Sequence, residues 1–235
     1  MLSNKDFLKA VSKAFEEFLN SGTSRSTAKI KPLHGAIAKD IATRLGRRFK
    51  IFSQGYGNDK ESTICGRYMD KMVDITITKK GEAIAGIGVK FVMQNYSQNS
   101  NNYFEDMLGE TANIRSAKHP YFQIFIILDK LPYYNRAKAI TKWENFTDHN
   151  VSKYVALAND DANTFFHTPN KTLIYVVHIP DNENLTSLDD YLDYYKKTNF
   201  NMEVSTHKYP HFGSAVILND YETFIEKVYY TVMAI

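Results

Sequence analysis

The sequence predicts an α/β protein in which helices flank a mixed central sheet. Its 235 residues suffice for one large domain with a full hydrophobic core. A hydrophobic share of 43% and a charged share of 23% are ordinary for a globular chain. Apolar strand-like runs alternate with segments of helical periodicity, which is typical of a sheet covered by helices.

Two helices are predicted in the first fifth of the chain. Apolar residues recur at helical spacing over residues 4–20, so this segment should form an amphipathic helix. A polar break over residues 21–27 follows. The second helix should begin near Pro32, because proline suits a first helical turn, and should end at Gly46.

Three strands are predicted next. Residues 49–54 form a short strand, and a tight turn over residues 55–58 follows it. Residues 72–78 and 83–92 are apolar runs joined by a Gly-Glu turn, so they should pair as a hairpin.

A helix and a buried strand complete the predicted core. The amides and serines of residues 94–102 indicate a loop that ends in a helix N-cap. A helix over residues 103–117 should follow. Residues 121–128 are almost continuously apolar, which is typical of a strand buried on both faces.

The chain beyond residue 131 is less regular. Residues 133–168 are polar and aromatic, with a short helix around 151–158, and could form an insertion. We expect residues 171–235 to extend the sheet and close it with a helix. The whole chain is thus predicted to be one domain, with its core at residues 31–128. The later elements are expected as a strand at 172–179, a helix at 185–196, a strand at 214–218 and a helix at 220–232.

Charge is distributed unevenly, although the net charge is only +3. Residues 25–50 hold eight basic side chains and one acidic one, so the remainder of the chain is net acidic. A basic segment of this kind suits contact with a polyanion, and it equally suits a solvated helix surface.

Asp74 and Lys90 are the most informative pair of residues. Each lies in one of two neighbouring apolar strands, where an isolated charge would be costly. On a hairpin the two side chains can meet. A carboxylate beside a lysine suits a divalent metal ion and a phosphate, whereas edge charges or a salt bridge would explain the same two residues without any catalysis.

This order of elements, with Asp74 on one strand and Lys90 on the next, resembles the PD-(D/E)xK nucleases, which include most type II restriction endonucleases. The resemblance covers residues 31–128. It implies a restriction endonuclease-like fold and a magnesium-dependent endonuclease that leaves 5′-phosphates. It also implies that two carboxylates hold Mg²⁺ and that Lys90 serves the attacking water.

The sequence departs from the family pattern at two positions. Val73 precedes Asp74 where proline is usual, and Gly88-Val89-Lys90 stands where Glu-x-Lys is expected. In one subgroup of the family the second carboxylate lies on the helix after the lysine strand. The resemblance therefore implies that Glu105, or else Glu110, acts with Asp74 and Lys90, and that Asp74 and Glu105 bind the metal.

The resemblance also implies contacts and partners. Double-stranded DNA would be the substrate and a homodimer the active form, in the cytoplasm, and a DNA methyltransferase could be encoded nearby. The single cysteine agrees with a reducing compartment, and no long apolar run predicts a membrane span. Six polar or basic residues are candidates for nucleic-acid contact: Arg67, Asn95, Gln98, Asn99, Arg136 and Lys138.

Two rival functions remain open at this stage. The first is a catalytically inactive nucleic-acid-binding protein on the same fold, because the second carboxylate of the motif is displaced. The second is an interaction module that binds no nucleic acid. His207 and His211 have a metal-like spacing, but Pro210 lies between them, so we interpret them as loop residues.

Overall fold

The computed structural model describes residues 1–22 and 30–235, and it confirms a mixed sheet flanked by helices. The sheet has seven strands in the order β1-β4-β5-β6-β9-β10, with β11 also paired to β9. Strands β5, β6, β9 and β11 run parallel, whereas β1, β4 and β10 are antiparallel to their neighbours. The strands are β1 (Phe49–Ser53), β4 (Ile75–Lys79), β5 (Glu82–Val92), β6 (Tyr121–Leu128), β9 (Lys171–His178), β10 (Glu203–Val204) and β11 (Val216–Leu218).

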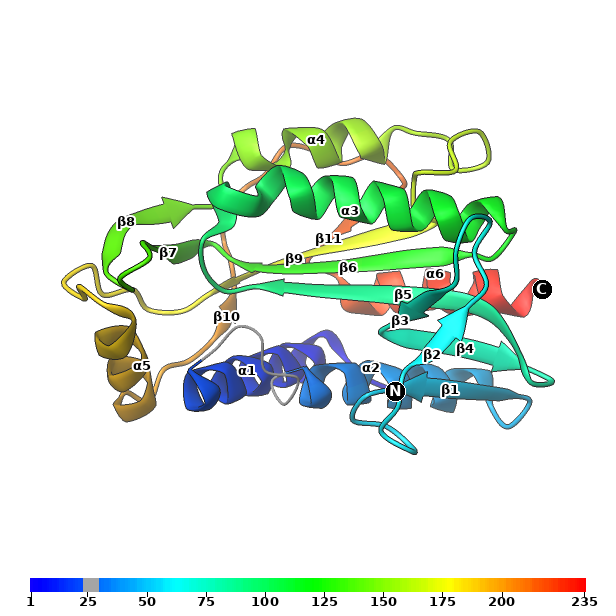
Figure 1. The fold of residues 1–235 in the computed structure, drawn as a ribbon, viewed down its shortest axis with the longest axis horizontal. Helices are drawn as coiled ribbons and strands as arrows, with labels where there is room; N and C mark the ends of the chain where they lie inside the picture. The colour runs from blue at the N-terminus through cyan, green and yellow to red at the C-terminus, as the bar shows by residue number, and fades with distance from the viewer. Residues whose placement is uncertain (23–29) are drawn as a thin grey trace.

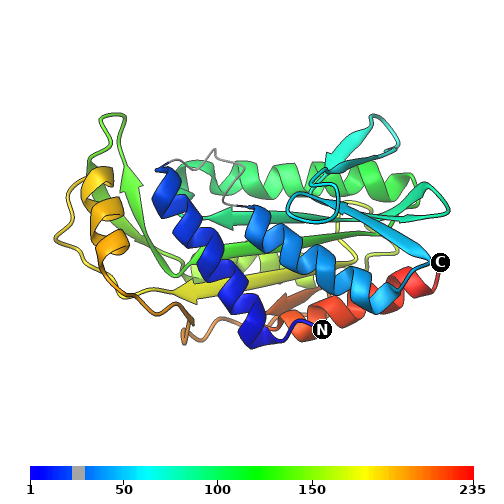
Figure 2. The same cartoon turned by 90° about the horizontal axis from the view of Figure 1, so that it is seen from below.

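Helices cover both faces of this sheet. Figures 1 and 2 show α1 (Asn4–Ser21), α2 (Lys31–Leu45) and α6 (Tyr221–Met233) on one face, and α3 (Tyr96–Ser116) and α4 (Asp148–Ala158) on the other. Helix α5 (Leu188–Lys197) lies beyond one end of the sheet, against α1. No helix formed by the described residues is long and apolar enough to cross a membrane.

Buried hydrogen bonds anchor α2 to its neighbours. The carboxylate of Asp40 accepts bonds from the backbone N–H of Leu2 at 2.8 Å and from the Tyr221 hydroxyl at 3.1 Å. It also pairs with Arg44 at 3.1 Å. Because a buried carboxylate needs such partners, these bonds fix α2 against the N-terminus and α6.

The predicted elements of the core are present, with one correction. The helices at 4–20 and 32–46, the hairpin and the buried strand at 121–128 match α1, α2, β4 with β5, and β6. The polar break predicted over residues 21–27 lies largely outside the described residues. Arg25 and Lys29 lie wholly outside them.

The loop predicted over residues 94–102 is wrong, because α3 begins at Tyr96. Asn95, with a left-handed φ of 51°, precedes the helix. The buried ring of Tyr96 packs against Phe146 at a centroid distance of 5.4 Å, and the backbone N–H of Ser97 donates to Glu144 at 3.1 Å. These tertiary contacts outweigh the weak helix propensity of the amides and serines.

Two small hairpins stand outside the main sheet. Strands β2 (Ser62–Ile64) and β3 (Lys71–Val73) pair with each other, as do β7 (Lys130–Tyr134) and β8 (Ile140–Asn145). The first hairpin was not predicted as a separate unit, and it determines the position of Asp74. The second lies within the segment predicted as an insertion.

Candidate active site

Asp74 lies where one extended segment changes its partner. Residues 71–73 pair with β2, and from Ile75 onward the chain pairs with β1 and β5. The last β4–β5 pair is Ile75 with Ile87. Beyond it, the backbone N–H of Val89 donates to the Asp74 carboxylate at 2.7 Å. The Asp74 side chain thus takes the hydrogen bond that a continuing ladder would have made.

Burial dominates the electrostatics of Asp74. Desolvation raises the pKa of its carboxyl to about 7, partly offset by the Val89 hydrogen bond. The neighbouring charges of Glu61 and Glu110 raise the pKa further, and Lys90 lowers it. A bound cation would stabilise the charged form of a carboxylate that is kept from water and lies near two others.

Lys90 approaches Asp74 from β5. Its ammonium lies 4.3 Å from the centroid of the Tyr103 ring. Desolvation lowers the pKa of Lys90, and the charges of Asp106 and Asp74 raise it. Both side chains line one cleft of about 730 Å³.

The predicted carboxylates of α3 line the same cleft. Glu105 is exposed there and attracts Lys153. Glu110 accepts a hydrogen bond from the Tyr121 hydroxyl and pairs with Lys71 at 2.9 Å. The structure therefore brings Asp74, Lys90, Glu105 and Glu110 into one cleft, with Glu110 already engaged by two partners.

Gly88 has no room for a carboxylate in the present arrangement. A Cβ atom at this position would lie 2.6 Å from the Tyr121 hydroxyl and 2.8 Å from the amide of Gln123. Gln123 is the direct neighbour of Gly88 in the β5–β6 register. Side chains of β6 thus occupy the space in which a Glu-x-Lys glutamate would begin.

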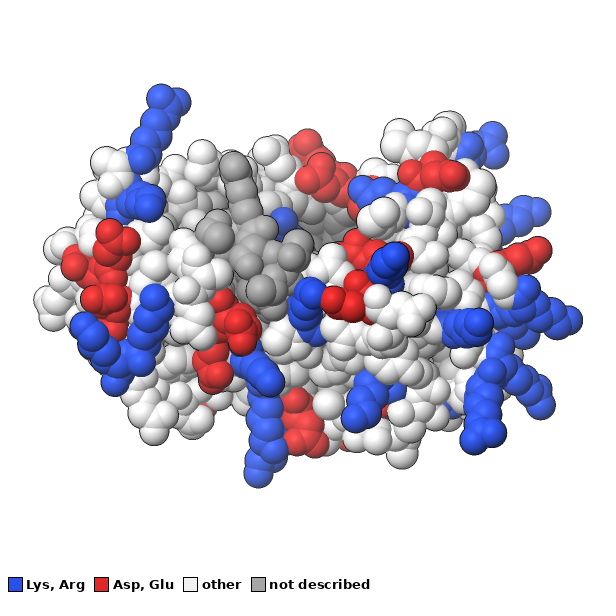
Figure 3. All heavy atoms as spheres, turned by 60° about the horizontal axis from the view of Figure 1, so that its bottom comes forward, with Lys and Arg blue, Asp and Glu red and all other residues white. Residues whose placement is uncertain are grey.

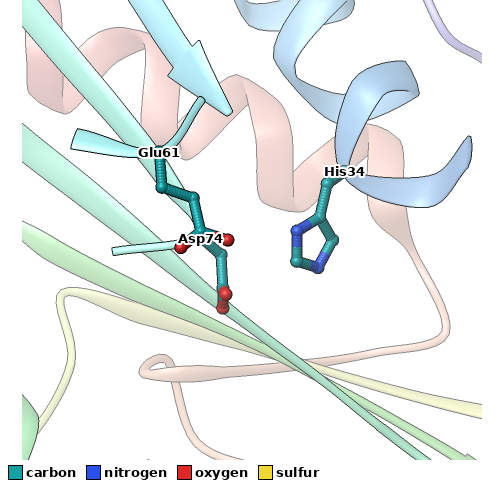
Figure 4. Close-up of side chains that lie close together, drawn as sticks. All are labelled: His34, Glu61 and Asp74. Atoms are coloured by element: carbon teal, nitrogen blue, oxygen red, sulfur yellow. The ribbon is translucent and has the colours of Figure 1, made fainter. Parts of the chain in front are cut away.

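A second group of side chains reaches Asp74 from the α2 side. Ligand atoms of His34, Glu61 and Asp74 all lie within 4.8 Å of one another, and Figure 4 shows the imidazole facing the two carboxylates. Among the described residues this is the one such group of three or more metal-ligating side chains. A possible metal site thus combines a nitrogen donor with two carboxylates.

Close backbone packing holds this group in place. A Cβ atom on Gly35 in α2 would overlap the backbone of Gly55 in the loop after β1, and a Cβ atom on Gly55 would overlap the backbone of Lys31 in α2. Asp59 accepts the N–H of Gly55 at 2.6 Å and pairs with Lys31. The loop that carries Glu61 is therefore fixed to the first turns of α2, which carry His34.

His34 and Glu61 are both affected by burial. Desolvation lowers the pKa of His34 to about 4, which favours the neutral imidazole. Desolvation raises the pKa of Glu61, whereas a 2.9 Å hydrogen bond from the Gln54 amide lowers it.

The six candidates for nucleic-acid contact lie in three regions. Arg67 is exposed in the β2–β3 connection, which α3 holds through hydrogen bonds of Asn113. Gln98 and Asn99 lie beside Lys90 in a smaller pocket, together with Asn95, whose side chain bonds the backbone of Tyr134. Arg136 and Lys138 are exposed in the β7–β8 turn.

Sequence reasoning missed His34 and Glu61 as site residues. His34 sits on the inner face of a correctly predicted helix, where a histidine is unusual among Leu33, Ile37 and Ile41. That feature was a usable signal. Glu61 follows an irregular loop, and no spacing rule connects it to Asp74.

Comparison with known proteins gives one distant structural likeness. No protein-family model and no curated protein sequence matches the chain. Its structure is similar to the cAAA-bound form of NucC from E. coli MS115-1, with a TM-score of 0.43 and 9% sequence identity over 98% of this chain and 90% of that chain. Identity and TM-score this low assign no activity.

Restoring the family tripeptide should damage the fold without improving the site. We expect Gly88→Ala to lower the free energy of unfolding by about 1–3 kcal/mol, because the methyl group overlaps Tyr121 and Gln123. Gly88→Glu should cost more and should not tighten metal binding. Urea denaturation and metal titration measure the two effects. Gly109→Ala on α3, which has open space around it, is the comparison and should instead raise the free energy of unfolding by about 1 kcal/mol, because alanine favours a helix. A stable Gly88→Glu protein that binds metal more tightly would contradict this expectation.

Removing the Asp74 charge should stabilise the metal-free protein at neutral pH. Since folding raises this pKa from 3.8 to about 7, the wild type loses stability as pH rises between those values. Asp74→Asn should therefore exceed the wild type by up to about 4 kcal/mol above pH 7, and the gain should shrink toward pH 4. Denaturant unfolding in EDTA tests this, with Asp70→Asn at an exposed site as control. Equal stability of wild type and Asp74→Asn at pH 8 would refute it.

Proposed function

We propose that this protein is a divalent-metal-dependent endonuclease of the PD-(D/E)xK superfamily that cuts double-stranded DNA in the manner of a type II restriction enzyme. The proposal is based on the position of Asp74. This residue lines the cleft together with Lys90, and it also lies close to Glu61 on the side of α2. Two partly buried carboxylates together with a lysine suit hydrolysis of a phosphodiester.

Asp74 and Glu61 fit a divalent cation better than the pair expected from the sequence. Oxygen atoms of these two carboxylates lie within 4.8 Å of each other, as ligands of one ion must. Glu110 is engaged by Tyr121 and Lys71, and Glu105 is exposed. We therefore assign the second carboxylate to Glu61, with Glu105 and Glu110 as charged residues of the cleft wall.

Hydrolysis requires few protein groups. A bound divalent ion would lower the pKa of water and offset the charge of the phosphate. Lys90 would orient the attacking water and donate a hydrogen bond to a phosphate oxygen. The water oxygen forms a bond to phosphorus, the bond from phosphorus to the 3′ oxygen breaks, and that oxygen takes a proton. The products are a 5′-phosphate and a 3′-hydroxyl.

A basic cluster supports a polyanionic substrate. It comprises Arg47, Arg48, Lys50, Lys79 and Lys80, which the β1–β4 register brings together, with Glu82 as the acidic residue opposite Lys79. Figure 3 shows Lys and Arg side chains gathered at this end of the molecule. No ion pair joins these five residues to any other residue among those described.

The cluster lies within reach of the same DNA molecule as Asp74. Strand β4 separates the two, and its five residues span about 17 Å at about 3.3 Å per residue. That length corresponds to about five steps along one DNA strand, at about 3.4 Å per step. Phosphates flanking a cut site could therefore contact the cluster.

Cleavage of a diverse linear DNA library is the direct test. With Mg²⁺ or Mn²⁺ the wild type should cut the library, and EDTA should stop it. Asp74→Asn and Lys90→Met should each reduce the rate by at least about 100-fold, because each removes a group that acts on the reacting atoms. Lys196→Met, at an exposed position on α5, is the matched control.

Three outcomes would overturn the endonuclease proposal. Cutting that persists in Asp74→Asn would point to a contaminating nuclease. DNA binding that is tight and salt-dependent, without any cutting under either metal, would support the inactive nucleic-acid-binding alternative. Absence of binding at low salt would favour an interaction module instead.

Reversing charge in the basic cluster should weaken DNA binding. We expect Arg47→Glu/Arg48→Glu to lower the affinity for many DNA sequences alike. The slope of log K against log salt concentration should become shallower by about two, at about 0.9 per lost phosphate contact. Fluorescence anisotropy at several salt concentrations measures both quantities. Lys5→Glu/Lys13→Glu makes the same charge change on exposed positions of α1. Equal losses in the two double variants would show only a general charge effect.

A further inference from the structure

His34 is a buried side chain that the proposed reaction does not use. It is 1% exposed, and neither ring nitrogen has a hydrogen-bond partner among the described residues. A buried polar atom without a partner destabilises the folded protein, so such groups call for an explanation. A structural histidine normally donates one N–H to a carbonyl or carboxylate, and His34 does not.

The orientation of His34 supplies an explanation. Its imidazole faces the carboxylates of Glu61 and Asp74 (Figure 4), with ligand atoms of the three within 4.8 Å of one another. Neither carboxylate is hydrogen-bonded to the ring. An ion between the three side chains would satisfy the imidazole nitrogen and offset the negative charges of the two carboxylates.

We propose that His34, Glu61 and Asp74 form a single mixed nitrogen–oxygen site that prefers a first-row transition-metal dication to Mg²⁺. The proposal rests on the proposed function for the use of the ion, but not for its binding. Mg²⁺ favours oxygen ligands and retains several waters, whereas imidazole is a good donor to Co²⁺, Ni²⁺ and Zn²⁺. One nitrogen donor among three ligands therefore shifts the preference toward these ions.

The surrounding structure preorganises the three ligands. The Gly35–Gly55 contact and the Asp59–Lys31 pair hold the Glu61 loop on α2, and the Val89 N–H holds Asp74. Ligands fixed before binding lose little conformational freedom when the ion arrives. Asp74 also lines the open cleft beside Lys90, so it belongs both to the ligand group and to the cleft wall.

Metal binding without DNA is the test. Isothermal titration should show Co²⁺ binding to the full chain at least about ten-fold more tightly than Mg²⁺, and the visible spectrum of bound Co²⁺ should report nitrogen ligation. His34→Gln should weaken Co²⁺ binding by about ten-fold or more while changing Mg²⁺ binding by less than about three-fold. His149→Gln, at an exposed position of α4, is the matched control.

A second variant keeps the test decisive if His34→Gln folds poorly. Glu61→Gln retains the size of the side chain and should weaken binding of both ions, and circular dichroism checks the fold of each variant. Equal affinity for Co²⁺ and Mg²⁺, or a Co²⁺ spectrum unchanged in His34→Gln, would overturn the proposed site.

The two proposals can fail separately. Selective Co²⁺ binding through His34 in a protein that cuts no DNA would uphold the metal site and reject the endonuclease. DNA cutting that depends on Asp74, with metal preference unchanged in His34→Gln, would uphold the endonuclease and reject His34 as a ligand.

Discussion

The hydrogen bond from the Val89 N–H to Asp74 is the interaction on which the candidate site depends. It closes the β4–β5 ladder at the residue beyond Ile75, where the chain turns away to pair with β2. One bond thereby fixes the carboxylate next to Lys90 and keeps it largely out of water. The burial of Asp74 raises its pKa, although the Val89 hydrogen bond itself lowers it.

The site also depends on how α2 meets the loop after β1. Two glycines permit backbone contact that no other residue would allow, and Asp59 secures the loop through Gly55 and Lys31. The buried bonds of Asp40 in turn hold α2 against α6 and the N-terminus. His34 and Glu61 thus owe their positions to contacts made far from the cleft.

The local sequence pattern was sufficient to predict most helices and strands of the core, whereas tertiary contacts determine which side chains meet at the candidate site. Periodicity was sufficient for α1 and α2, which each bury one side of the helix, and apolar runs were sufficient for β5 and β6. They were not sufficient for the start of α3. That start depends on the packing of Tyr96 against Phe146 and on the hydrogen bond from Ser97 to Glu144 of β8. Asp74 and Lys90 could be singled out because charges in apolar strands are anomalous. Glu61 could not, because only the folded loop brings it near them.

Gly88 connects these observations. The β6 side chains Tyr121 and Gln123 fill the space beside it, and Tyr121 also engages Glu110. A carboxylate on β5 would have to displace a buried tyrosine and break that bond. Glu61 reaches Asp74 from the opposite side, where the strand has left the sheet and the α2 helix supplies His34. The small residue at position 88 and the group of His34, Glu61 and Asp74 therefore result from one packing arrangement. In that arrangement the proposed cation would be held toward α2, and the cleft beside Lys90 would stay open for a phosphate.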